Sequence, residues 1–191
     1  CPAPVCGPSR ASLLTGLRPQ TSGVFGNNDN WKEMALPKIP ATLPQHFKNN
    51  GYKAVKVGKL FHYQMEHPES WNRELVSRIN GRDFYSSFDA KVMSKLKALD
   101  PVEGGGWFAE HLQWGPIDCK AGEFRDGHYA TSVSNYLAKD HETPFFLAVG
   151  FRAPHVKFAA PKQFFDQYDV NEIVIPDNPS NDLDDMPYIK S

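Results

Sequence analysis

The densest group of reactive side chains lies in the first ten residues, where Cys6 and Arg10 stand four positions apart. A cysteine just before a helix is made more nucleophilic by the positive end of the helix dipole and by a nearby arginine. The free backbone N–H groups of such a helix start, together with Arg10, would also bind an anion. The segment therefore indicates a nucleophile beside an anion site, although a structural cysteine in a turn would show the same local pattern.

Three further candidates follow two predicted strands. The alternating segment 52–58 and the continuous apolar run 145–151 are both typical of strands, and the second is of the kind buried in a parallel sheet. Lys59 and His62 lie at or just beyond the end of the first strand, and His155 follows the second. Ligands in α/β folds collect outside the carboxyl ends of the strands, so we expect these three side chains to converge.

Helical patterns alternate with these strands. Helices are predicted at 11–16, 43–50, 88–99, 126–140 and 161–167, while 17–40 reads as a loop and the rest of 63–125 as irregular. Ser9 and Thr42 are the expected N-caps, and Gly16 and Gly51 the expected stops. The residues expected to face the core from 126–140 are Ala130, Val133 and Leu137. This order predicts an α/β layer fold with a mainly parallel sheet flanked by helices.

The composition argues against several classes of protein. The chain has 191 residues, of which 40% are apolar, enough for the core of one domain. Its 21 Lys and Arg nearly balance its 22 Asp and Glu, and a net charge of -1 argues against nucleic acid or an anionic membrane as a partner. No apolar run approaches membrane-spanning length. The three cysteines cannot all pair within the chain, and a disulfide between two of them stays open.

The nucleophile segment carries a more specific pattern. Cys-Gly-Pro-Ser-Arg at 6–10, followed by Leu-Thr-Gly at 14–16, resembles the first signature of the type I sulfatases at every defined position. In that family the cysteine is oxidised after translation to formylglycine, and the maturing enzyme reads Cys-x-Pro-x-Arg. The resemblance implies that Cys6 is the modified residue and Arg10 its neighbouring anchor.

The segment 51–62 resembles the second signature of the same family. It departs from that signature at Ala54, where Ser or Thr is usual, and we expect this mid-strand departure to affect packing rather than chemistry. Two signatures in the right order argue against a chance match. The matching residues are Gly51, Tyr52, Val57, Gly58, Lys59, Phe61 and His62.

A third match covers 144–155 and ends in Pro154 and His155, where sulfatases carry a Pro-His whose histidine contacts the sulfate. The run 145–150 and the Val-Gly-Lys-x-Phe-His at 57–62 look most like the iduronate-2-sulfatase branch. The resemblance spans essentially the whole chain but is strong only in the three matched segments. It implies an alkaline-phosphatase-like α/β sandwich.

The resemblance also implies a reaction, the hydrolysis of an O-sulfate on a sugar or polysaccharide such as a glycosaminoglycan. The formylglycine at position 6 would hydrate to a gem-diol, whose one hydroxyl attacks sulfur while the other later helps to expel sulfate. Lys59 and Arg10 would supply fixed positive charge. His62 would contact the diol, and His155 would contact the sulfate. His155 is a candidate acid for the leaving oxygen, and the choice between the two histidines stays open.

Four more residues are candidates for substrate binding. Arg152 and Lys157 flank His155 and would meet a substrate carboxylate or further sulfates, unless they are solvated surface charges. Asn28 and Trp31 lie in a polar and aromatic loop soon after the nucleophile segment. They would line a sugar subsite, unless the loop is only an ordered turn.

Sulfatases of this family hold a calcium ion, or magnesium in its place, which polarises the sulfate as a Lewis acid. The resemblance implies that Cys6, as formylglycine, is one ligand. The other ligands would come from an Asp-Asp segment before the first signature and from a segment well after residue 191. We therefore expect 1–191 to be a partial sulfatase catalytic domain, inactive without the remainder of the sulfatase chain.

Rival functions stay open beside this one. A phosphatase or phosphonate hydrolase of the same superfamily would share the site, and a carbohydrate-binding fragment or pseudoenzyme would share the fold without the reaction. The expected partners are a sulfated carbohydrate and a formylglycine-generating maturation enzyme, with no nucleic acid and no membrane. The family resemblance implies a secreted, periplasmic or lysosomal location.

Overall fold

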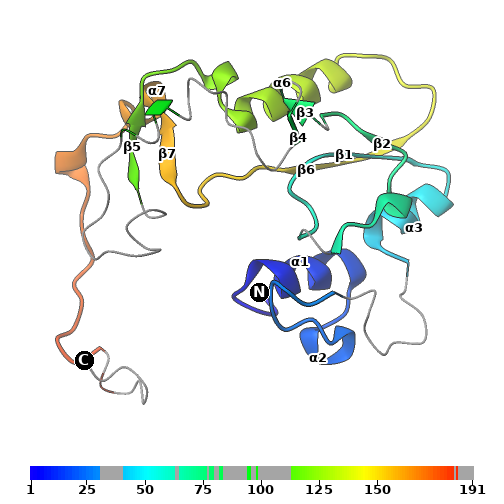
Figure 1. Ribbon diagram of the computed structural model, residues 1–191, viewed down its shortest axis with the longest axis horizontal. Coiled ribbons are helices and arrows are strands. Elements are labelled where there is room, and N and C mark those ends of the chain that lie inside the picture. Colours follow the sequence, from blue (N-terminus) through cyan, green and yellow to red (C-terminus); the bar gives the residue numbers. More distant parts are fainter. Residues whose placement is uncertain are drawn as a thin grey trace.

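The computed structural model describes residues 1–30, 41–62, 65–76, 78–79, 82–83, 94–95, 98, 113–182 and 184. The described part is an α/β arrangement in which helices flank a short parallel sheet (Figure 1). The predicted fold class is therefore confirmed. The helix predicted at 88–99 lies outside the described residues, apart from 94–95 and 98.

The central sheet has the strand order β2-β1-β6. Its strands are β1 (Lys53–Gly58), β2 (Arg73–Glu74) and β6 (Phe145–Gly150). β1 runs parallel to β6 over its full length, from Lys53 opposite Phe145 to Gly58 opposite Gly150. Both predicted strands are confirmed with one correction: the side chains of β6 before Gly150 are half-buried rather than buried, because β6 is the outer strand of the described sheet.

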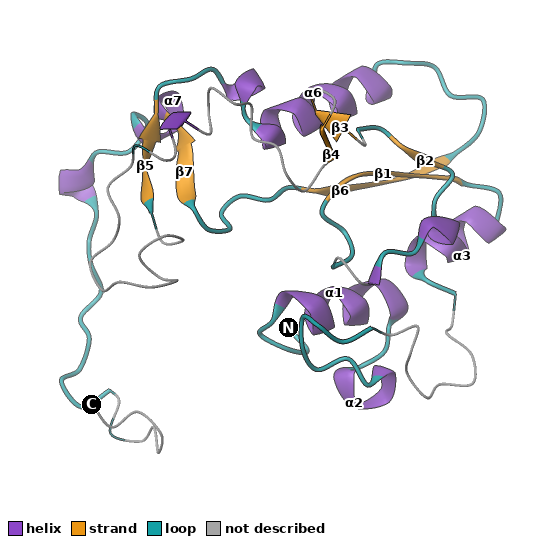
Figure 2. Ribbon diagram, viewed as in Figure 1, coloured by secondary structure: helices purple, strands orange, loops and turns teal. Residues whose placement is uncertain are grey.

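Helices cover both faces of this sheet. α1 (Cys6–Thr15) and α3 (Leu43–Asn49) lie on one side, and α6 (Arg125–Leu137) lies on the other (Figure 2). Successive side chains of a strand point to opposite faces, and β1 uses both. Ala54 joins the cluster that contains Leu14 of α1, whereas Val57 packs with Tyr129 of α6.

α1 begins earlier than the sequence predicted. The helix runs from Cys6 with Val5 as its N-cap, so Ser9 lies inside the helix and does not cap it. Pro8 falls in the first turn, where its missing N–H has no helical hydrogen bond to lose. Gly16 ends the helix in the left-handed conformation at φ 73°, as expected. Cys6 is therefore the first residue of the helix rather than a residue before it.

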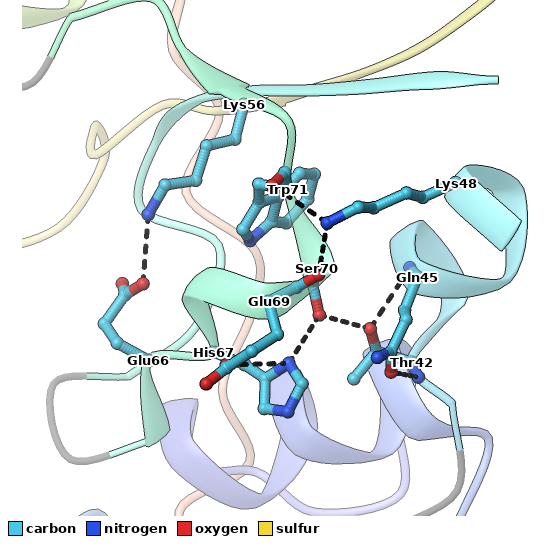
Figure 3. A network of polar contacts seen from close by, with 9 residues as sticks. All are labelled: Thr42, Gln45, Lys48, Lys56, Glu66, His67, Glu69, Ser70 and Trp71. Carbon is cyan, nitrogen blue, oxygen red and sulfur yellow. Dashed lines mark hydrogen bonds and ion pairs between the residues drawn. The ribbon is translucent and has the colours of Figure 1, made fainter.

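The cap of α3 is confirmed, and it is tied to a neighbouring turn. Thr42 accepts from the N–H of Gln45 and completes a capping box with it. The hydroxyl of Thr42 also contacts that of Ser70 in the 3-10 turn η3 (Pro68–Ser70), and Ser70 lies 2.8 Å from Nδ1 of His67 (Figure 3). Lys48 donates to the carbonyl of Glu69 at 2.9 Å. These bonds fix the chain that follows β1 against α3.

The buried face of α6 differs from the prediction. Tyr129 and Tyr136 are buried, Val133 is half-buried, and Ala130 and Leu137 are exposed. The apolar reading missed the tyrosines because their rings pack in the core although each carries a hydroxyl.

Further elements lie in stretches that read as loop or irregular. α2 (Pro19–Ser22) falls within 17–40, and β5 (Trp114–Ile117) and η4 (Ala121–Glu123) fall within 63–125. β5 pairs in parallel with β7 (Phe158–Pro161), and Figure 1 shows this pair apart from the central sheet. The helix predicted at 161–167 is the shorter α7 (Lys162–Phe165). The remaining elements are β3 (Arg78–Ile79), β4 (Arg82–Asp83) and η5 (Val170–Glu172). Among the described residues, no helix has the length and apolar character needed to cross a membrane.

Candidate active site

β1 and β6 end in two glycines that face each other. Gly58 lies opposite Gly150 and has φ 85°. A Cβ on Gly58 would stand 2.1 Å from the carbonyl oxygen of Gly150, and a Cβ on Gly150 would stand 2.0 Å from that of Lys59. The N–H of Lys59 donates to the carbonyl of Gly150 at 2.8 Å. Only glycine fits at either position, so the two segments leave the sheet in contact.

Lys59 is buried directly after this glycine pair, with 5% of its surface exposed. Its carbonyl accepts a hydrogen bond from Nη1 of Arg10, which also donates to the carbonyl of Leu60 at 3.1 Å. Arg10 stands one turn after Cys6 on α1. The guanidinium of Arg10 therefore ties the helix that begins at Cys6 to the end of β1.

Charged groups from α1 and from the segment after β6 act on the ammonium of Lys59. Burial lowers the pKa of Lys59, and the positive charges of Arg152 and Arg10 lower it further. The thiol of Cys6 acts in the opposite direction, since its anion favours the charged ammonium. Lys59 is therefore a desolvated cation near one candidate nucleophile and two arginines.

His62 belongs to the same cluster. Burial lowers its pKa, and the charge of Lys59 lowers it further, with smaller effects from Arg10 and His155. A hydrogen bond with the backbone of Asn27 acts against these effects. The imidazole is therefore held toward its neutral form. The structure thus brings together all five residues that the sequence predicted for the chemistry: Cys6, Arg10, Lys59, His62 and His155.

Asn27 is a residue of this site that the sequence analysis missed. Its side-chain oxygen accepts from the N–H of Gly7 at 2.7 Å, while its backbone bonds to His62. Gly7 allows this approach, because a Cβ there would stand 2.9 Å from the carbonyl of Gly26. The sequence marked this loop only as polar, and the neighbouring Asn28 was chosen as the candidate for substrate binding.

The loop that carries His155 is held by a second residue that the sequence analysis missed. The carboxylate of Asp126, in the first turn of α6, accepts from the N–H of Arg152 at 3.0 and 3.1 Å and from that of Ala153 at 2.8 Å. His155 itself is exposed. Lys157 donates through Nζ to the side chain of Gln113. The available signal was only an acidic residue at the start of a predicted helix.

The remaining candidates for substrate binding lie elsewhere. Asn28 is exposed in a turn that Asp29 closes by accepting from the N–H groups of Phe25 and Gly26. These two bonds lower the pKa of Asp29. This geometry fits the ordered-turn alternative for Asn28. Trp31 lies outside the described residues.

Two cavities border the cluster. The first covers the start of α1 and is lined by Cys6, Ser9 and Arg10, with Cys1 on its wall. The second lies beside His155 and is lined by Arg125, Asp126, Arg152 and Lys157 among others. The first opens onto the candidate nucleophile, and the second opens onto the candidate acid.

A bound calcium ion needs several oxygen ligands close together. Within the described ranges, no three His, Cys, Asp or Glu side chains lie close enough to hold a cation. These residues therefore do not by themselves fit the calcium site that the resemblance implied. All three cysteines have free thiols, and that of Cys6 is half-buried.

The sequence of the chain is similar to those of known proteins. A family model described as Sulfatase matches residues 1–185. A sulfatase of Formosa agariphila is 33% identical over 191 residues, which cover 98% of this chain and 37% of that protein. Human iduronate 2-sulfatase is 30% identical, covering 92% of this chain and 31% of that enzyme. Rat N-acetylgalactosamine-6-sulfatase is 31% identical, covering 84% of this chain and 32% of that enzyme. The chain thus spans about a third of the length of the curated relatives that it matches.

Proposed function

Because this chain belongs to the sulfatase family, we propose that it forms part of an enzyme that hydrolyses the O-sulfate ester of a sulfated sugar or polysaccharide. One observation carries the proposal: a free thiol at the first residue of α1 lies in the electrostatic reach of the buried ammonium of Lys59. Sulfate ester hydrolysis needs this combination, because a nucleophile must meet a sulfur atom whose oxygens carry negative charge.

Cys6 is the proposed origin of the nucleophile. Once oxidised to formylglycine by a maturation enzyme, position 6 supplies in its hydrated form one hydroxyl to attack sulfur and another to release the product. The accessibility of the Cys6 thiol supports this role. The thiol of Cys6 is free, half-buried and at the wall of a cavity that Ser9 and Arg10 also line.

Lys59 and Arg10 are proposed to act through positive charge. Lys59 is buried, so its charge is weakly screened and acts strongly on the sulfuryl oxygens. Because carbonyl groups of the chain hold the guanidinium of Arg10, its charge stays in one place during the reaction. Fixed charges of this kind need no reorganisation when negative charge develops.

The two histidines are proposed to move the protons. His62 is held toward its neutral form by burial and by Lys59, which suits a proton acceptor at the nucleophile. His155 is exposed at the second cavity, which suits contact with the sulfate and proton donation to the leaving oxygen. The opposite assignment of the two roles is an outcome that the pH dependence of single variants would reveal.

The names of the relatives support a proposal for the substrate class. Two of them are named for sulfated sugars, iduronate 2-sulfate and N-acetylgalactosamine 6-sulfate, so we propose a sulfated carbohydrate of the glycosaminoglycan type. We further propose a secreted, periplasmic or lysosomal location, and a catalytic domain that is completed by chain segments beyond these residues. Asn28 and Trp31 remain candidates for a sugar subsite.

The test is a mass measurement at Cys6, followed by an activity assay. The full reading frame is produced with a formylglycine-generating enzyme, and the peptide that contains Cys6 is examined for conversion of the thiol to an aldehyde. Turnover of an aryl sulfate is then compared with that of an aryl phosphate, with Cys6→Ala as the control. Aldehyde formation and faster sulfate release support the proposal. A thiol that persists where a control sulfatase is converted would favour a carbohydrate-binding pseudoenzyme, and faster phosphate release would favour a phosphatase.

A further inference from the structure

The cavity beside His155 carries a surplus of positive charge. Arg125, Arg152 and Lys157 line it, and the carboxylate of Asp126 is the one negative group in its described lining. That lining does not include Cys6, Lys59 or His62, so the cavity adjoins the proposed reaction centre rather than coinciding with it. His155 belongs to both.

The carboxylate of Asp126 leaves this surplus in place. It accepts three hydrogen bonds from the backbone N–H groups of Arg152 and Ala153, at 2.8 to 3.1 Å. These bonds direct the carboxylate to the main chain and hold the loop in one conformation. Its negative charge still opposes an incoming anion, but Arg152 and Lys157 both border the cavity beside this single acidic side chain.

The cations of the cavity are also held in place. Lys157 donates to the side-chain oxygen of Gln113, which is neutral and buried, with 7% of its surface exposed. This bond orients the ammonium without neutralising it. Arg125 is 4% exposed at the first position of α6. Arg152 lies near enough to Lys59 to lower its pKa, so the cavity and the reaction centre share one electrostatic field.

A sulfate monoester carries one negative charge, which Lys59 and its neighbours already meet in the proposed function. From the separate set of cations we infer that the cavity beside His155 is a second-anion subsite, which binds a carboxylate or a second sulfate carried by the substrate near the sulfate that is cleaved. The inference rests on the proposed function. Both groups present oxygen atoms that a guanidinium or an ammonium binds through charge-assisted hydrogen bonds.

The test compares three substrates in the complete matured protein. The first is a sulfated uronic acid, the second its carboxyl-reduced counterpart, and the third a neutral sugar with two sulfates. Each is assayed for sulfate release with the unmodified protein and with Arg152→Gln and Lys157→Gln. Lys139→Gln is the matched control, because Lys139 is exposed after α6 and does not line the cavity.

Selective loss is the expected result. Each cavity variant should lower kcat/KM by about 10- to 100-fold for a substrate with two anionic groups, chiefly through KM, and by far less for the carboxyl-reduced sugar. Loss with the uronic acid alone assigns the subsite to a carboxylate, and loss with the disulfated sugar alone assigns it to a sulfate.

Two results would overturn the subsite while the proposed function stands. Equal loss for all three substrates would mean that Arg152 and Lys157 act on the cleaved sulfate itself. Unchanged kcat/KM in both variants, or the same loss in Lys139→Gln, would mean that the cavity binds no substrate group. Failure of the unmodified, matured protein to release sulfate from any substrate would instead overturn the proposed function, and the subsite with it.

Discussion

The segments that follow β1 and β6 start from the same point and then differ. Both leave the sheet at the facing glycines, Gly58 and Gly150. After β1 the chain turns inward, and Lys59 and Phe61 are 5% and 1% exposed. After β6 the chain stays at the surface, where Phe151 is 49% exposed and His155 is also exposed.

The buried segment after β1 suits the stabilisation of charge, and the exposed segment after β6 suits the selection of substrates. A buried cation such as Lys59 pays a desolvation cost and gains a strong, constant field, which suits the sulfuryl group that every substrate of a sulfatase presents. An exposed loop costs little to vary, and substrate selection is commonly carried by such loops on a rigid scaffold. We therefore expect changes after β1 to affect all substrates, and changes after β6 to affect them unequally.

The largest effect should come from the glycine pair that both segments share. Gly58→Ala forces a Cβ to 2.1 Å from the carbonyl of Gly150 at a positive φ, so it should lower the free energy of unfolding by about 3 kcal/mol or more. Denaturant unfolding of the complete protein measures this loss.

Gly51→Ala is the matched control for this variant. Gly51 has the same φ of 85°, but a Cβ there meets nothing within 4 Å. It should cost only the conformational strain, about 1 to 2 kcal/mol. Equal losses in the two variants would show that the strand ends are not in the close contact described here.

A smaller effect is expected from the residue that holds the second segment. Asp126→Asn places an amide N–H where the backbone of Arg152 or Ala153 donates, so the loop of His155 should lose its fixed position. We expect kcat/KM to fall about 10- to 100-fold, as for other residues that orient a reactive group.

A double variant shows whether Asp126 acts through His155. In a His155→Gln protein, Asp126→Asn should cause little further loss, because residues that act as a unit are not additive. The control is Asp169→Asn, which removes an exposed carboxylate that bonds the N–H of Asn171. An undiminished loss from Asp126→Asn in the His155→Gln background would contradict a positioning role.

The smallest expected effect is a change in the pKa of His62, in the segment that follows β1. Lys59→Met removes a positive charge that disfavours protonated His62, so the pKa of His62 should rise toward its ordinary value. The folded pKa of His62 lies below the unfolded one, so the unfolded state binds more protons and stability falls as pH drops through the histidine range. Lys59→Met should reduce this acid-induced loss.

An NMR titration of the His62 ring protons measures the shift directly. Lys56→Met is the control, because Lys56 lies on β1, three positions before Lys59, but pairs with Glu66 at 3.0 Å and Glu74 at 3.7 Å. An unchanged pKa of His62 in Lys59→Met, or the same rise in Lys56→Met, would argue against the proximity of Lys59 and His62.

Much of the site could be predicted because its residues lie at marked points of the chain. The β-prone segment ending in Gly58 and the apolar run ending in Gly150 are local patterns, and Lys59, His62 and His155 follow them directly. The parallel pairing of two such strands brings their carboxyl ends to one edge. The convergence of Lys59, His62 and His155 therefore follows from element type and order, whereas the approach of Cys6 and Arg10 on α1 does not.

Other features could not be predicted, because they depend on partners far away in the sequence. Asn27 accepts from Gly7 across 20 positions, and Asp126 accepts from Arg152 across 26. An asparagine in a turn and an aspartate opening a helix look the same whether or not a distant amide reaches them. The predicted start of α1 was wrong for a different reason: several residues before Ala11 could begin that helix, and Ser9 was only one of them.

By itself, the sequence determined the strands β1 and β6, the presence of the helices α1, α3 and α6 and the reactive residues near their ends, since all of these depend on neighbours within a few positions. The tertiary structure decided which groups share one electrostatic environment. Lys59 is a buried cation at the point where the chain of β1 meets α1, and Arg10 of α1 bonds to its carbonyl across 49 positions. Burial and charge depend on three-dimensional distance, which the order of residues in a chain does not contain.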